Sequence, residues 1–152
     1  MNSQKIEKFS VIGISVRTTN ENGAAAKDIP TLWNKFMTEN IAAKIPNKVD
    51  SDIYCIYTDY EKDHTKPYTT ILGCKVENIE TIPNDMVGKV VSETTYEKYV
   101  ATGNVLQGSV FNEWTKIWNS DLPRTFTADF EVYGDKAKDF ENAEVELFIA
   151  VK

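Results

Sequence analysis

The sequence has few of the residues that reactive or cross-linked sites need. Its 152 residues include only two cysteines, Cys55 and Cys74, and one histidine, His64. Two cysteines are too few for a disulfide framework, and we expect them to be reduced and buried as small apolar side chains. With a single histidine, which lies in a polar stretch, zinc sites and Cys-His nucleophiles are poorly supported. The sequence therefore predicts no metal, no cofactor and no catalytic residue.

Long apolar runs and basic runs are also missing. No stretch approaches the roughly 20 apolar residues of a membrane-spanning helix, so the default expectation is a cytoplasmic protein with no membrane partner. Seventeen Lys and Arg against 23 Asp and Glu give a formal net charge of −6, and the basic residues are not clustered. Binding to a phosphate backbone requires clustered cations, which argues against direct nucleic-acid binding. A field of this sign attracts cations instead.

The sequence does contain a repeated order of strand-like and helix-like segments. In the first half, β-branched and aromatic runs predict strands at residues 8–19, 53–60 and 68–76. Apolar spacings of three and four predict a helix that opens at residues 28–30 and ends before Ile45. In the second half, the same criteria predict extended chain at 89–102, a helix at 105–119 and strands at 126–133 and 143–151. Each half is therefore expected to run strand, helix, strand, strand.

This repeated order predicts the fold class. A three-stranded sheet with one helix across it is too small to bury its own surface, so two such modules should pack together. We predict an α+β fold of duplicated strand-helix-strand-strand modules with pseudo-twofold symmetry, antiparallel sheets, two main helices and a central cleft. The length suits one domain, residues 1–152, with halves at about 1–80 and about 81–152.

The strand predicted at residues 126–133 carries the most distinctive pattern. Its two-residue repeat places Phe130 and the residues two positions away on one face, which we expect to be core. Asp129, Glu131 and Tyr133 share the other face. An ionised carboxylate between apolar neighbours is unfavourable unless a cation or hydrogen-bond donors compensate it, which makes Glu131 a candidate cation-binding group. The alternative is that this face is solvated and Glu131 has no role.

Five segments together resemble a known family. They are residues 9–14, 96–103, 114–118, 130–133 and 145–151. In this order they are similar to the gyrase-inhibitor-like, or AraC-type, effector-binding superfamily, which includes the ligand-binding domains of multidrug-responsive transcription regulators. Within it the sequence most resembles the stand-alone, integron-cassette-associated effector-binding proteins. The similarity covers nearly the whole chain, and the helical DNA-binding module of the regulators is expected to be absent.

The resemblance implies a function and a set of site residues. Members of the superfamily have a central pocket for bulky apolar cations, lined by aromatic rings and floored by a buried glutamate. The family's glutamate lies in a Phe-Glu-x-Tyr run that matches residues 130–133, so the resemblance gives this role to Glu131, with Tyr133 beside it. Family segments that border the cleft contain Trp114 and Tyr99. Face and aromatic character add five residues that are candidates for either the pocket or the core: Trp33, Phe36, Tyr57, Tyr68 and Phe148.

Three classes of function remain open from the sequence. The resemblance favours a binding protein for hydrophobic or aromatic cations, acting as a transcription-linked sensor or a sequestering protein. Aromatic faces attract such cations, and a carboxylate neutralises their charge. A second class is a protein-interaction module whose partner is gyrase or a transcription regulator. A third is a hydrolase in which Glu131 activates water as a general base, although no Ser-His-Asp, Cys-His or metal constellation supports it.

Overall fold

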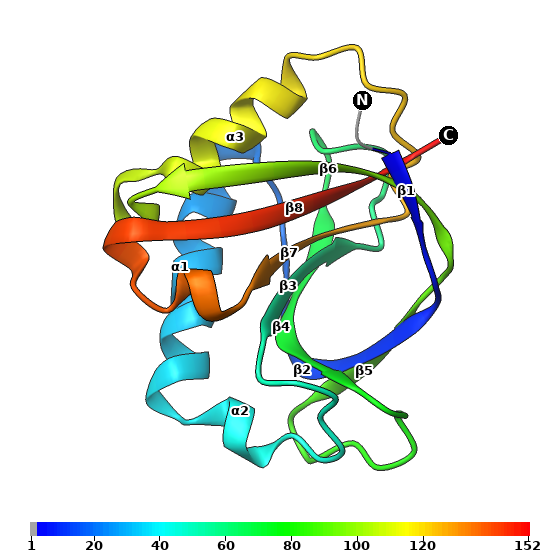
Figure 1. Ribbon diagram of the computed structural model, residues 1–152, viewed down its shortest axis with the longest axis vertical. Helices are drawn as coiled ribbons and strands as arrows, with labels where there is room; N and C mark the ends of the chain where they lie inside the picture. The colour runs from blue at the N-terminus through cyan, green and yellow to red at the C-terminus, as the bar shows by residue number, and fades with distance from the viewer. Residues whose placement is uncertain (1–2) are drawn as a thin grey trace.

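The structure is a computed structural model that describes residues 3–152, and its central feature is one eight-stranded antiparallel sheet that curls on itself (Figure 1). The strands are β1 (Ser3–Ile6), β2 (Phe9–Thr18), β3 (Ile53–Thr58), β4 (Tyr68–Val76), β5 (Val87–Val91), β6 (Thr94–Gly103), β7 (Ala128–Tyr133) and β8 (Ala143–Val151). The helices are α1 (Ala24–Thr38), α2 (Ile41–Lys44) and α3 (Ser109–Trp118). The strand order across the sheet is β1-β6-β8-β7-β3-β4-β2-β5.

The predicted repeat of strand, helix, strand, strand is confirmed. The first module consists of β2, α1, β3 and β4, and the second of β6, α3, β7 and β8. Each module contributes three neighbouring strands, in the orders β2-β4-β3 and β6-β8-β7. The modules join edge to edge where β3 pairs with β7, so their sheets are continuous and related by a pseudo-twofold arrangement about this junction.

Two short strands cross between the modules. The segment predicted as extended chain at 89–102 consists of two strands, because Ser92 and Glu93 separate β5 from β6. β5 pairs with β2 of the first module, and β1, which the sequence pattern missed, pairs with β6 of the second. Each half thus adds its leading strand to the outer edge of the other half. These pairings are non-local, and strands of four and five residues are too short to show a clear periodicity.

The first helix begins earlier than predicted. α1 starts at Ala24, after Gly23 in the left-handed conformation with φ of 72°, and not at residues 28–30. Residues 24–26 are all alanine, which has the highest helix propensity, and they extend the helix upstream. Asp28 therefore lies inside α1, where it accepts a hydrogen bond of 2.8 Å from Thr18 Oγ1 at the end of β2.

Both predicted helices are divided by one residue in the left-handed conformation. Asn40, with φ of 52°, separates α1 from α2, and asparagine tolerates this conformation better than most residues. Gly108, with φ of 98°, separates a short 3₁₀ turn, Val105–Gln107, from α3. Both predicted helical regions are therefore present, but each is interrupted, and the first begins earlier than predicted.

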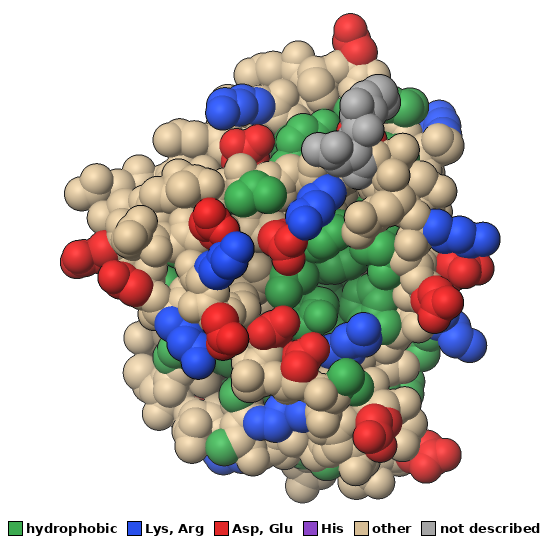
Figure 2. All heavy atoms as spheres, in the orientation of Figure 1, with side chains coloured by type: hydrophobic (Ala, Val, Ile, Leu, Met, Phe, Trp, Pro, Cys, Tyr) green, Lys and Arg blue, Asp and Glu red, His purple; other side chains and the backbone are tan. Residues whose placement is uncertain are grey.

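The two faces of the sheet pack differently. Both main helices lie on one face (Figure 1), where their apolar stripes pack with strand residues such as Leu72 and Leu147. The second core cluster contains buried residues from strands alone, among them Phe9, Phe130 and Phe148. It occupies the inside of the curl, where Figure 2 shows apolar side chains in a hollow with charged side chains around it. The face of β7 predicted as core lies in this second cluster, which confirms that prediction.

Two smaller expectations concern glycine and cysteine. Gly13 and Gly73 lie directly opposite each other in β2 and β4, and a Cβ on Gly13 would collide with the carbonyl oxygen of Leu72. The close approach expected at a glycine inside a strand is therefore present. Cys55 and Cys74 are free and buried, as predicted. Within the described part of the chain, none of the helices has both the length and the apolar character of a bilayer span.

Candidate functional site

A cavity of about 550 Å³ lies between α1 and α3, with the sheet as its floor. Its lining is rich in aromatic rings from helices, strands and a loop. α1 contributes one indole, α3 contributes two indoles and a phenyl ring, β3, β4 and β7 each contribute a phenol ring, and the β3–β4 loop contributes a phenol and an imidazole. These residues are Trp33, Trp114, Trp118, Phe111, Tyr57, Tyr68, Tyr133, Tyr60 and His64. The position of the cavity follows from the duplication, because each module places one helix on the same face of the shared sheet.

Glu131 of β7 lies at the floor of this cavity. Its side chain is almost completely buried, with the residue 1% exposed. Oε2 accepts hydrogen bonds from the Tyr57 hydroxyl at 2.8 Å and from Trp114 Nε1 at 2.6 Å, and Oε1 accepts one from the Tyr133 hydroxyl at 2.6 Å. None of the ion pairs found in residues 3–152 involves Glu131. The alternative interpretation, in which Glu131 lies on a solvated strand face, is wrong.

The surroundings of Glu131 act on its protonation in opposite directions. Burial raises the pKa of its carboxyl above the ordinary value of 4.5, and the hydrogen bonds from Tyr133, Trp114 and Tyr57 partly oppose that shift. Burial also raises the pKa of the Tyr57 and Tyr133 hydroxyls well above their ordinary value, so both remain protonated donors at neutral pH. The carboxylate is therefore stabilised by neutral donors alone, which leaves its charge without a counter-charge.

A second carboxylate on the same face of β7 has such a counter-charge. Asp129 is fully buried, and its Oδ2 lies 2.7 Å from Arg124 Nη2 and accepts a bond of 2.6 Å from the Tyr60 hydroxyl. Its Oδ1 accepts the backbone N–H of Ala150 at 2.8 Å. Arg124 and Tyr60 both line the cavity, so this ion pair forms part of its wall.

The structure brings six of the nine predicted site residues together. Glu131, Tyr133, Trp114, Trp33, Tyr57 and Tyr68 all line the cavity. The other three do not. Phe36 is buried in the core beneath the helices, and Tyr99 of β6 packs against the same core. Phe148 lies on the opposite face of the sheet, where its ring stacks on Phe130 with 4.9 Å between the ring centroids.

Sequence reasoning missed the cavity residues that lie in loops. His64 lies in the loop between β3 and β4, and its ring stacks on Trp118 with 5.7 Å between centroids and an interplanar angle of 9°. Asn20 connects that loop to the sheet, since its Nδ2 donates to the His64 carbonyl at 2.8 Å and its Oδ1 accepts from the Tyr68 hydroxyl at 2.6 Å. Loops have no periodic pattern, so only the scarcity of histidine and arginine in the sequence could have drawn attention to His64 and Arg124.

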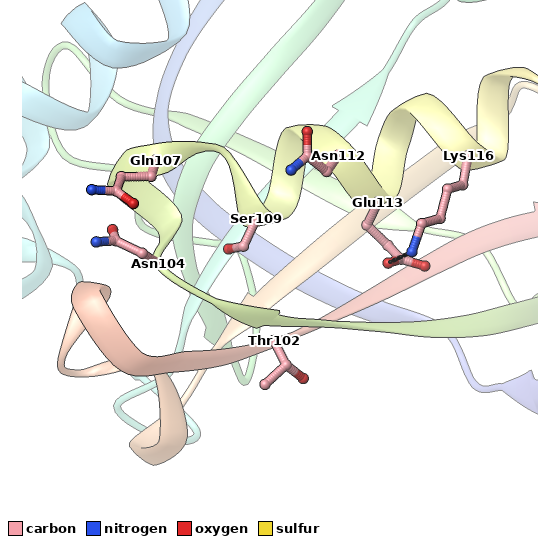
Figure 3. Close-up of a pocket in the computed structure, with 7 residues that line it drawn as sticks. All are labelled: Thr102, Asn104, Gln107, Ser109, Asn112, Glu113 and Lys116. Atoms are coloured by element: carbon pink, nitrogen blue, oxygen red, sulfur yellow. Dashed lines mark hydrogen bonds and ion pairs between the residues drawn. The ribbon is translucent and has the colours of Figure 1, made fainter.

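A second cavity, of about 340 Å³, lies beside the start of α3 and is polar (Figure 3). Its lining carries no aromatic ring and consists of Thr102, Asn104, Gln107, Ser109, Asn112, Glu113 and Lys116. Its one carboxylate, on Glu113, already has a cation in Lys116 at 3.5 Å. The aromatic cavity is the better candidate site, because it alone combines a buried carboxylate without a counter-charge and a set of aromatic rings.

Two strand-helix-strand-strand modules around an aromatic cavity with a buried glutamate are the arrangement that the resemblance to effector-binding proteins implies. The chain belongs to the family of integron-associated effector binding proteins, which it matches over residues 4–151. Binding of a small effector molecule is the function that this membership supports.

Individual relatives agree with this assignment. The chain is 27% identical over 144 residues to YobU of Bacillus subtilis (strain 168), provisionally named a transcriptional regulator protein, covering 92% of this chain and 90% of YobU. An integron cassette protein from the mobile metagenome of Vibrio cholerae is 34% identical, with a TM-score of 0.78 and coverage of 99% of this chain and 95% of that one. SAV2435, solved bound to tetraphenylphosphonium, has a TM-score of 0.81 at 17% identity, covering 99% and 93% of the two chains. At that identity the likeness to SAV2435 concerns the fold.

Proposed function

We propose that the protein binds hydrophobic aromatic cations in the cavity between α1 and α3, with Glu131 as the counter-charge. The observation that carries this proposal is a buried carboxylate that accepts three neutral hydrogen bonds and forms no ion pair within residues 3–152. A buried charge without a counter-charge is unfavourable, and a ligand cation would relieve this cost. The indole and phenol rings around it add attraction of about 0.5–2 kcal/mol per ring in contact with the cation.

The relatives support this ligand class. Tetraphenylphosphonium, the ligand in the SAV2435 structure, is a bulky aromatic cation. Because contacts with aromatic faces are weakly directional, a cavity of this kind accepts cations of different shape. The naming of YobU supports a role connected to transcription. We therefore propose a cytoplasmic, single-domain sensor or sequestering protein for such cations, with a transcription regulator as a candidate partner.

The test is a thermal-shift titration with a matched pair of ligands, methyltriphenylphosphonium and neutral triphenylphosphine oxide. A ligand that binds only the folded state stabilises it by roughly 2.7 kcal/mol at a hundredfold excess over its Kd, which corresponds to a shift of about 5–11 °C for a chain of this length. The cation should stabilise the wild type, and Glu131→Gln should lose most of that shift while its response to the oxide is unchanged.

The control is Glu113→Gln, which makes the same substitution outside the aromatic cavity and should keep the full response to the cation. Recovery of the cation chemically intact after incubation distinguishes binding from hydrolysis. An equal loss for the cation and the oxide in Glu131→Gln would contradict the charge-pairing role. The absence of any shift with cations would contradict the proposed function itself.

A further inference from the structure

The guanidinium of Arg124 is buried in the cavity wall, and only part of it is used. The Arg124 side chain is 4% exposed, and Nη2 contacts Asp129. Its other two nitrogens, Nε and Nη1, are buried and have no hydrogen-bond partner in residues 3–152. Together these two nitrogens carry three N–H groups. An unsatisfied buried donor is unfavourable, so this arrangement destabilises the fold unless something else accepts hydrogen bonds from these groups.

Aromatic rings hold this unused part of the guanidinium in place. Cζ of Arg124 lies 4.3 Å from the ring centroid of Phe126 and 5.8 Å from that of Trp114. His64, which also lines the cavity, adds another buried nitrogen without a partner among the described residues, its Nδ1. Three unsatisfied nitrogens thus belong to two residues of the same cavity wall.

The ion pair with Asp129 and the packing on Phe126 and Trp114 account for one nitrogen and the faces of the guanidinium. They leave Nε and Nη1 without an acceptor among the described residues. The planar fork of a guanidinium binds a carboxylate or another oxygen acceptor through two parallel hydrogen bonds. The fork of Arg124 is engaged on one nitrogen and free on the other two.

The free donors and Glu131 are connected through one side chain. Trp114 donates from Nε1 to Glu131 Oε2 at 2.6 Å, and its ring lies beneath the Arg124 guanidinium. The cavity therefore has a negative group at the edge of this indole and a positive group over its face. Arg124, Trp114 and Glu131 all line the cavity, so both charged residues border the space that one ligand would occupy.

We propose that Arg124, assisted by His64, forms a second subsite that binds an oxygen acceptor on the ligand, a carboxylate above all, while Glu131 binds its cationic part. This inference rests on the proposed function and narrows it, because the preferred ligands are then aromatic cations that also carry a carboxylate. Such ligands satisfy the free N–H groups of Arg124 and the charge of Glu131 at the same time.

The experiment compares three probes that share a triphenyl head, with affinities measured by isothermal titration calorimetry at pH 7.5. Pentyltriphenylphosphonium has the cation alone, (4-carboxybutyl)triphenylphosphonium has the cation and a carboxylate, and 6,6,6-triphenylhexanoate has the carboxylate on a neutral head. We expect the carboxylate to strengthen binding of the phosphonium to the wild type about tenfold, the lower end of a charge-assisted hydrogen bond.

The matched variants are Arg124→Lys and Arg17→Lys, the same change at the two arginines of the sequence. Arg124→Lys keeps a cation for Asp129 but removes the fork, so the gain from the carboxylate should fall to threefold or less. Arg17→Lys, outside the cavity, should keep the full gain. If Arg124→Lys does not fold, the three probes still decide the question on the wild type.

Each outcome of the wild-type series is decisive. Equal affinity of the two phosphonium probes, or tighter binding of the pentyl probe, overturns the subsite and leaves the proposed function standing. Binding of the hexanoate without binding of the pentyl cation supports the subsite and contradicts the proposed cation site. Binding of none of the probes overturns both proposals.

Discussion

Asp129 and Glu131 are two residues apart on the same face of β7, and both are buried, but their partners differ in kind. Asp129 has a cation, Arg124, together with a phenol and a backbone N–H. Glu131 has two phenols and an indole, all of them neutral. β7 thus carries two buried carboxylates. Asp129 is paired with a cation of the protein, whereas Glu131 accepts hydrogen bonds from neutral groups.

On the proposed function, the presence or absence of a cationic partner distinguishes a structural carboxylate from a ligand-binding one. Burial does not distinguish them, because both side chains are buried. Both groups would be selected by a search for buried acids, and both line or adjoin the same cavity. Of the two carboxylates, Glu131 is the one without a counter-charge among residues 3–152, so it is the one that a ligand cation can pair with. On the proposed function, the hydrogen bonds from neutral donors stabilise that charge while no cation is bound.

The largest expected effect concerns the structural member of the pair. Asp129→Asn leaves Arg124 buried without an anion and should lower the free energy of unfolding by about 3–5 kcal/mol, as measured by urea denaturation. Glu131→Gln should cost far less, because it removes a charge that has no ionic partner. A loss of similar size in Glu131→Gln would remove the distinction between the two carboxylates.

The next effect is the pH dependence of cation binding. Because burial raises the pKa of Glu131, its carboxyl takes up a proton at a higher pH than an exposed glutamate does, and the proton competes with the cation. Below that pKa the affinity for methyltriphenylphosphonium should fall by up to about tenfold per pH unit, measured by calorimetry between pH 4 and pH 8. Triphenylphosphine oxide is the control, and a parallel decline in its affinity would contradict the assignment to Glu131.

A smaller effect is expected when one donor is removed from Glu131. Among its hydrogen bonds, the one from Tyr133 opposes the effect of burial most strongly, so Tyr133→Phe should raise the pKa of Glu131 further. The decline of cation binding with falling pH should then begin at a higher pH than in the wild type. Loss of this bond should also cost roughly 1–3 kcal/mol of stability. Tyr54→Phe, on the opposite face of the sheet, is the matched control and should leave the affinity unchanged. An effect of the same size in both variants would point to general loosening of the fold.

The smallest effect is on the unliganded protein. The folded state holds a proton on Glu131 more tightly than the unfolded state does, because its pKa is raised from 4.5. The free energy of unfolding therefore falls as pH rises from about 4.5 through the raised pKa, and this part of the profile should be absent in Glu131→Gln. The variant should gain stability relative to the wild type as pH rises, which urea denaturation at several pH values can measure. A constant difference across that range would argue against a raised pKa.

Much of the fold could be predicted because its signals are local. The strands 68–76 and 143–151 were predicted with the bounds that the structure has, since long β-branched runs mark them clearly. The two faces of β7 follow from simple alternation. The crossing of β1 and β5 could not be predicted, because those strands pair with residues 74–94 positions away and their own sequences are short.

The site residues that could be predicted from the sequence are those on strands and helices. Glu131, Tyr133 and Trp114 lie on a strand and a helix, and a family resemblance could place them. Arg124 lies in the irregular segment between α3 and β7, and its position depends on the ion pair with Asp129 and on packing against aromatic rings. Such contacts are properties of the folded chain, so no pattern in the sequence marks them.

The exchange of leading strands between the modules has a consequence for how ligands enter and leave. Besides the β3–β7 junction, the pairings of β1 with β6 and of β5 with β2 bind the halves together. Separating the modules would break all three pairings, whereas the rim of the cavity beside His64 is held by Asn20 through two hydrogen bonds, one to the His64 carbonyl and one from the Tyr68 hydroxyl. On the proposed function, we therefore expect a ligand to pass by this rim, which can move at a smaller cost in hydrogen bonds than the sheet.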